Sequence, residues 1–160
     1  MVKALRPNDS LISENRRARF DYAVAETYEA GIVLTGSKVK SLRNGQAQIE
    51  SSYAGVDRDG AVKIFGMFIE EYKQAGPHLQ HEPKRVRNLL LKQKELRKIT
   101  IALTREGMTL VPLKLYFTKR GKAKLLLGLA KGKNTVDKRA SIKERDWNKE
   151  KARTLREKNR

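Results

Sequence analysis

The sequence predicts a mainly β protein: a small antiparallel barrel with two or three short helices and a basic C-terminal tail that is disordered or conditionally helical. Three observations support this fold class. Apolar and polar residues alternate in several stretches between residues 23 and 130, turn-forming pairs such as Asn44-Gly45 separate those stretches, and residues 131–160 contain few apolar side chains.

The first predicted strand covers residues 23–35 and is followed by a short helix over 37–43. Glu26 is the one misfit on the apolar face of this strand, because that face is otherwise formed by Val24, Tyr28, Ala30, Ile32 and Leu34. Asn44-Gly45 ends the helix, since this pair tolerates positive φ.

Two further strands, 47–56 and 61–70, are predicted to form a hairpin. Residues 57–60 (DRDG) supply its turn. A loop over 73–87 follows, because Gly76-Pro77 and Pro83 break any regular structure there.

The next predicted element is a helix over 88–97, with Asn88 as its N-cap and a further helical piece over 98–104. A strand over 108–118 would place Val111, Leu113, Leu115 and Phe117 on one face. Pro112 cannot donate a ladder hydrogen bond and should therefore lie at an edge or a bulge.

A last strand, 122–130, directs Ala123, Leu125, Leu127 and Leu129 inward after a turn at 119–121. Five or six antiparallel strands with short interposed helices are typical of a closed or nearly closed barrel of the OB type.

Charge and composition limit the possible functions. The 160 residues contain 36 Lys and Arg against 18 Asp and Glu, a net charge of +18, and no cysteine. Disulfides, Cys-based zinc sites and thiol catalysis are therefore excluded. No apolar run reaches the roughly 18–20 residues that span a bilayer, and no secretory signal opens the chain, so a cytoplasmic protein is expected.

The positive charge indicates a polyanionic partner. Solubility alone needs a net charge of only about 2–8, so a general solubility surplus is the weaker explanation. Nucleic acid or the ribosome fits better, and an anionic membrane fits less well because no basic helix has a broad apolar face.

The chain divides into a flexible arm (1–14), an RNA-binding barrel (15–130) and a basic tail (131–160). The tail has 12 Lys or Arg and 5 Asp or Glu among its residues. Its thin apolar stripe, which includes Trp147, cannot hold a helix in water but could order against RNA. An inert extension is the alternative, against which the placement of the only tryptophan argues.

Three basic clusters are candidate RNA contacts. The run NRRARFDY at 15–22 offers guanidinium groups for phosphates and aromatic rings for bases, although a solvated lead-in to the barrel is the alternative. Lys40 and Arg43 project together from the helix 37–43, and Arg85 with Arg87 would lie at the start of the helix 88–97, where backbone N–H groups favour phosphate.

No catalytic or metal-binding pattern is present. His78 and His81 lie in a loop without cysteine or a carboxylate pair, which is a poor metal signal, and Asp57 and Asp59 fit the geometry of a turn. We therefore expect no enzyme activity, no cofactor and no metal.

A family resemblance rests on motifs that occur in order along the chain. They are NRRARFDY (15–22), EAGIVLTG (29–36), VKSLR (39–43), LLL (89–91), AKGK (130–133), DKR (137–139) and IKERDW (142–147). This combination resembles the small protein B family of SsrA-binding proteins. The resemblance implies an OB-type barrel that binds the tRNA-like domain of transfer-messenger RNA (tmRNA) and, with it, rescues ribosomes stalled without a stop codon.

The resemblance and the basic clusters together give the candidate site residues. The RNA-binding set is Asn15, Arg16, Arg17, Arg19, Glu29, Lys40, Arg43, Arg87, Leu90 and Lys92. The tail set, implied to enter the decoding region and the empty mRNA channel, is Lys131, Gly132, Lys133, Asp137, Lys138, Arg139, Ile142, Lys143, Arg145 and Trp147. Two positions depart from the family pattern: Lys92 replaces an Asn found in some relatives, and Lys38 occupies a place often held by Glu.

These observations predict a monomeric, non-enzymatic adaptor for tmRNA and the ribosome. A ribosomal or RNA-chaperone OB protein with loose sequence preference is the alternative in the same class. An RNA-processing enzyme is the alternative from another class.

Overall fold

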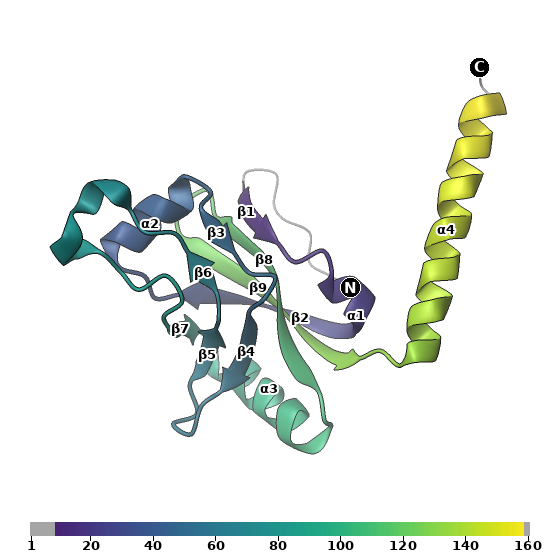
Figure 1. The fold of residues 1–160 in the computed structure, drawn as a ribbon. Coiled ribbons are helices and arrows are strands. Elements are labelled where there is room, and N and C mark those ends of the chain that lie inside the picture. The colour runs from purple at the N-terminus through teal and green to yellow at the C-terminus, as the bar shows by residue number, and fades with distance from the viewer. Residues whose placement is uncertain (1–8, 159–160) are drawn as a thin grey trace.

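The structure is a computed structural model that describes residues 9–158 (Figure 1). Its strands are β1 (Ser10–Glu14), β2 (Tyr22–Ile32), β3 (Ala47–Gln48), β4 (Tyr53–Val56), β5 (Val62–Phe65), β6 (Phe68–Ile69), β7 (Arg87–Leu90), β8 (Thr109–Phe117) and β9 (Ala123–Gly132). Its helices are α1 (Ala18–Asp21), α2 (Gly36–Arg43), α3 (Gln93–Arg105) and α4 (Thr135–Lys158), with two single-turn 3₁₀ helices, η1 (Lys73–Ala75) and η2 (Pro77–Leu79).

The main sheet closes into a barrel, as predicted. Its strands are ordered β1-β8-β4-β5-β7-β2-β9, every pairing is antiparallel, and β8 also pairs with β9. This last pairing joins the two ends of the sheet, because β1 and β4 share the other edge of β8. A separate two-stranded sheet, β3 with β6, lies beside it.

Apolar side chains fill both faces of the long strands. The inner cluster includes Ile64, Leu115, Leu125 and Leu127, and Ile99 of α3 joins it. A second, outer cluster consists of Ala18, Val111, Leu113, Tyr116, Leu126 and Ala130. The outer cluster explains why the middle parts of β8 and β9 have apolar residues on both faces.

Bulges in β2 and β8 change which face a residue occupies. The register of β2 shifts between Val24 and Glu26, so Val24 joins the outer cluster while Tyr28 and Ala30 face the core. Glu26 stays exposed and accepts a hydrogen bond from the Tyr28 hydroxyl at 2.6 Å. Burial and this carboxylate together raise the pKa of Tyr28 above its usual value.

The second bulge confirms the prediction for Pro112 and corrects the one for its strand. The register of β8 shifts between Pro112 and Lys114. Val111 and Leu113 therefore face outward while Leu115 and Phe117 face the core, so the predicted single face over 108–118 is wrong.

The predicted helix over 88–97 is also wrong in its first half. Residues 87–90 form β7, which joins β5 to β2 and buries Leu89 in the core. The helix starts only at Gln93, where the Glu95 carboxylate accepts the Lys92 backbone N–H at 3.0 Å. Asn88 is therefore a strand residue, and the two predicted helical pieces form one helix.

Shorter strands replace the long predicted ones on either side of residues 57–60. The turn itself is confirmed, because the Asp57 N–H donates to the Ala61 carbonyl at 2.8 Å and Gly60 has a φ of 75°. Within the predicted strand 47–56, the Ser52 hydroxyl donates to the Ile49 carbonyl at 2.6 Å, and the chain bends there between β3 and β4.

The two ends of the chain differ from their predictions in part. Residues 1–8 of the predicted flexible arm lie outside the described residues, but residues 10–14 form β1 on the edge of β8, so that part of the prediction is wrong. At the other end β9 continues to Gly132 and α4 projects from the barrel (Figure 1). Residues 135–158 are thus helical, whereas the sequence predicts a tail that is disordered or becomes helical against RNA. Its disorder as a free segment in water stays a prediction.

Candidate nucleic-acid interface

Leu90 and Glu29 lie on the outer face of the barrel, on neighbouring strands. Gly31 pairs with both Leu90 and Lys124, and Glu29 pairs with Leu126 of the outer cluster. Since paired residues in antiparallel strands point to the same face, one band of side chains crosses β7, β2, β9 and β8. We call this band the outer strip; its members are Leu90, Gly31, Glu29, Lys124, Tyr116 and Lys114.

Glu29 is held in place by its neighbours on the outer strip. The Tyr116 hydroxyl donates to Glu29 Oε2 at 2.8 Å, and Lys124 Nζ lies 3.9 Å from Glu29 Oε1. The Glu29 side chain keeps 26% of its surface exposed. A carboxylate fixed in this way can accept a hydrogen bond from a base amine or a 2′-hydroxyl.

Leu90 stands beside a shallow groove of about 350 Å³. Its lining combines apolar side chains, among them Ile32 and Phe117, with the basic side chains of Lys122 and Lys124. Leu90 is 62% exposed. An apolar side chain beside two lysines can contact a ribose or an unstacked base while the lysines meet phosphates.

Ion pairs extend the outer strip toward the basic run at 15–22. Glu14 Oε1 lies 3.4 Å from Lys114 Nζ, and Glu14 Oε2 lies 3.9 Å from Arg16 Nε. The Arg16 and Arg17 side chains are 89% and 82% exposed, and Arg19 is also exposed. These three arginines are therefore accessible from solvent, although Arg17 Nε also lies 3.2 Å from Asp21 Oδ2, and their contact with RNA stays a prediction.

Asn15 does not belong with them, which corrects the prediction of an RNA contact. Its side chain is buried, donates to the Pro112 carbonyl at 3.2 Å and accepts the Ala18 N–H at 3.1 Å. Asn15 therefore joins α1 to the bulge of β8.

Arg87 also has a structural position instead of the predicted phosphate contact. It is 2% exposed and donates to the Met67 carbonyl at 2.6 Å and the Pro83 carbonyl at 2.8 Å. Burial, with a smaller contribution from Arg85, lowers the pKa of Arg87 to about 10. The helix N-terminus that was expected beside it begins six residues later.

Lys40, Arg43 and Lys92 are exposed, as an RNA contact requires. Lys40 Nζ lies 5.3 Å from the centre of the Tyr72 ring. Lys92 lies two residues beyond Leu90, at the N-cap of α3, and does not line the groove. Lys38 is the exception on α2, because it is buried.

The base of the tail contacts the barrel through the segment of α1. Lys131 and Gly132 belong to β9, where they pair with Ala23 and Tyr22. Lys133 Nζ donates to the Arg19 carbonyl at 2.9 Å, and Lys138 Nζ lies 3.4 Å from Asp21 Oδ1. Further along α4, the Arg145 guanidinium lies 5.6 Å from the centre of the Phe20 ring.

The rest of the predicted tail set is exposed on α4. This set consists of Asp137, Arg139, Ile142, Lys143 and Trp147. Trp147 is 67% exposed and has no core to enter, as expected from the sequence.

Neither histidine indicates a metal site. The buried His81 ring accepts the Ser37 hydroxyl through Nδ1 at 3.1 Å and donates from Nε2 to the Ile69 carbonyl at 3.2 Å, so its role is structural. Among the described residues, no group of three or more His, Asp or Glu side chains could hold a metal ion.

None of the helices between residues 9 and 158 combines the length and the apolar composition of a membrane span.

Sequence reasoning missed Lys124, Tyr116 and Lys114. The signal for Lys124 was available in the sequence, because Lys122 and Lys124 alternate with the inward-facing Ala123 and Leu125. Lys114 and Tyr116 alternate in the same way with the inward-facing Leu115 and Phe117, beyond the bulge at Pro112.

A closed antiparallel barrel with a cationic outer face and a projecting basic helix defines a nucleic-acid-binding protein. The chain belongs to the SmpB family: the SmpB protein family matches residues 12–157.

Curated relatives named SsrA-binding protein are similar over nearly the whole chain. The relative from Mesorhizobium japonicum is 51% identical and the alignment covers 98% of this chain and 97% of that protein. The relative from Nitrobacter winogradskyi is 55% identical over 91% of this chain and 92% of that protein. A solved structure described as "tmRNA-SmpB: a journey to the center of the bacterial ribosome" has 48% identity and a TM-score of 0.62, covering 76% of this chain and 84% of that chain.

Proposed function

We propose that this protein is a non-enzymatic adaptor that binds the tRNA-like domain of tmRNA and delivers it to stalled ribosomes for trans-translation, in the cytoplasm. Its relatives are SsrA-binding proteins, and its similar solved structure is one of tmRNA with SmpB. The observation that carries the proposal is the outer strip, where a fixed carboxylate, an exposed leucine and lysines lie together on one face of the barrel.

Each part of the outer strip has a separate task in this proposal. The lysines and the three arginines at 16, 17 and 19 contact phosphates, which supplies affinity but no selectivity. Glu29 and Leu90 contact groups that distinguish folded, unpaired nucleotides from a regular duplex. The pair therefore favours tmRNA over RNA in general.

The tail serves the ribosome in this proposal. A helix of 24 residues is about 36 Å long and about 10–12 Å wide with its side chains. In this proposal the helix enters an RNA-lined channel that no mRNA occupies. Occupied channels exclude the tail sterically, so stall recognition needs no enzymatic step. The basic residues of α4 would neutralise the phosphates of the channel wall.

Competition binding tests the tmRNA proposal against the alternative of a loosely specific RNA chaperone. The tRNA-like domain and an unrelated duplex of equal length would compete for the protein at moderate salt. A preference of at least about tenfold for the tRNA-like domain, or about 1.4 kcal/mol, is expected. Equal affinities would favour the chaperone.

A matched pair of variants tests whether the outer strip is responsible. Burying a leucine is worth about 1.5–3 kcal/mol, so Leu90→Ala should weaken binding of the tRNA-like domain by about tenfold. Ile101→Ala is the control, because Ile101 is also exposed but lies on α3. Equal effects of the two changes would contradict the assignment of the outer strip.

A further inference from the structure

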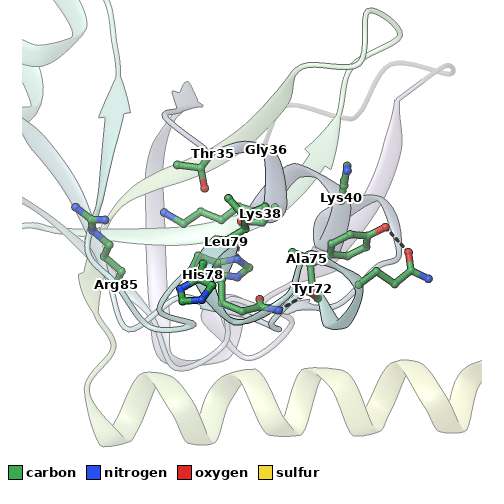
Figure 2. Close-up of a pocket in the computed structure, with 13 residues that line it drawn as sticks. Thr35, Gly36, Lys38, Lys40, Tyr72, Ala75, His78, Leu79 and Arg85 are labelled. Atoms are coloured by element: carbon green, nitrogen blue, oxygen red, sulfur yellow. Dashed lines mark hydrogen bonds between the residues drawn. The ribbon is translucent and has the colours of Figure 1, made fainter.

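A second hollow, of about 600 Å³, lies between the start of α2 and the segment that carries η1 and η2 (Figure 2). Its lining includes Lys38, Lys40, His78 and Arg85 but no Asp or Glu. It shares no lining residue with the Leu90 groove, and Val39 lines that groove from the same helix. The two hollows are therefore separate sites.

Lys38 is the unusual residue of this hollow. It is 5% exposed, and its ammonium makes no hydrogen bond or ion pair among the described residues. Its charged neighbours are Arg87 and Arg85, which with burial lower the pKa of Lys38. Glu82 acts on Arg87 but does not line the hollow. An anion beside the Lys38 ammonium would stabilise its charged form.

The start of α2 lacks an anion as well. The helix begins at Gly36, and its first turn contains no acidic residue and receives no side-chain cap. The Ser37 hydroxyl is already used, since it donates to His81. The third helical position, where a carboxylate would complete a capping box with Thr35, is occupied by Lys38.

We infer that this hollow binds a phosphate group, held by the N–H groups at the start of α2 and by the Lys38 ammonium, with Arg85 at its edge. A phosphate there supplies both the counter-charge of Lys38 and the missing cap of the helix. A Glu at position 38 would have supplied an anion from the chain itself, so the site is a consequence of Lys38. The phosphate can be a free ion or part of an RNA backbone.

Backbone amide NMR on the full chain provides the test. Inorganic phosphate and hexauridylate are titrated separately at matched ionic strength in chloride, and the amide signals of Gly36, Ser37 and Lys38 are followed. Saturable shifts of these amides are expected. Lys38→Glu and Lys38→Met should each weaken the response by about tenfold or more, and Lys38→Glu should also raise the unfolding temperature in phosphate-free buffer. Lys98→Met, on the exposed face of α3, is the matched control and should respond like the parent.

Each outcome decides the proposal. Saturation by hexauridylate at a lower concentration than by inorganic phosphate supports an RNA phosphate, and saturation by inorganic phosphate alone supports a free ion. If neither ligand shifts these amides, or if the Lys38 variants respond like the parent, the site does not exist. A loss in Lys98→Met as large as in Lys38→Met would mean general charge attraction and would also overturn it. None of these results depends on tmRNA, so the proposed function is tested separately.

Discussion

Replacing Arg87 with methionine distinguishes a structural arginine from an RNA contact. The guanidinium donates to two carbonyls, one of Met67 and one of Pro83, and so ties β7 to the segment on each side of β6. A hydrogen bond from a charged group is worth about 1.5–3 kcal/mol, and the cost of burying the charge offsets part of that gain. We expect Arg87→Met to lower the free energy of unfolding by about 2–4 kcal/mol.

Urea unfolding followed by circular dichroism measures this loss, and filter binding measures affinity for the tRNA-like domain at a temperature where the variant is folded. Affinity should stay within about twofold of the parent. Arg85→Met is the control, because Arg85 is exposed and its loss should change stability by less than about 0.5 kcal/mol. Unchanged stability in Arg87→Met together with a tenfold or greater loss of affinity, which is about 1.4 kcal/mol, would refute this reasoning.

Three further changes test the packing, the electrostatics and the interface. Gly128→Ala should destabilise the protein by about 1–3 kcal/mol, because the new Cβ would lie 3.0 Å from Leu113 Cδ1; an unchanged unfolding temperature would contradict the fit of the outer cluster. Burial lowers the pKa of Lys38 from 10.5, so keeping this residue protonated costs the folded state stability at neutral pH, and Lys38→Met should be more stable than the parent there. This difference in the free energy of unfolding should shrink as the pH rises toward 10.5, because the parent then loses the proton in the folded state. A difference that stays constant with pH would contradict the assigned burial. Lys124→Met should reduce the slope of log affinity against log salt by about one, whereas an unchanged slope would remove Lys124 from the phosphate contacts.

The parts of the fold that the sequence predicts well are those with local signals. The turn at 57–60, the helix near 37–43 and the inward face of β9 each depend on residues close together in the chain. Pro112 is also correctly placed, because a residue without an N–H restricts its own surroundings.

The parts that sequence reasoning misses depend on distant contacts. The Leu89 region satisfies a helical pattern, yet it forms β7 because the barrel needs a strand between β5 and β2. Arg87 and Asn15 have the residue types of an RNA contact, but carbonyls of other elements bind them in the interior. Nothing within a short window of sequence identifies those carbonyls.

The candidate site shows the same division. Glu29 and Leu90 were identified by resemblance, and the structure places them on adjacent strands. Lys124 joins them only through the register of β2 with β9, which the sequence does not reveal. The base of the tail likewise contacts the barrel through Lys138 and Asp21, which are distant in the chain.

Removing α4 tests most directly the claim that the barrel binds tmRNA while the tail acts on the ribosome. The cut belongs after Asn134, because Lys131 and Gly132 are part of β9. Affinity of the shortened protein for the tRNA-like domain at moderate salt should stay within about threefold of the parent, while peptide tagging on stalled ribosomes is lost. A loss of affinity of about tenfold or more, or tagging at the parental level, would contradict the account.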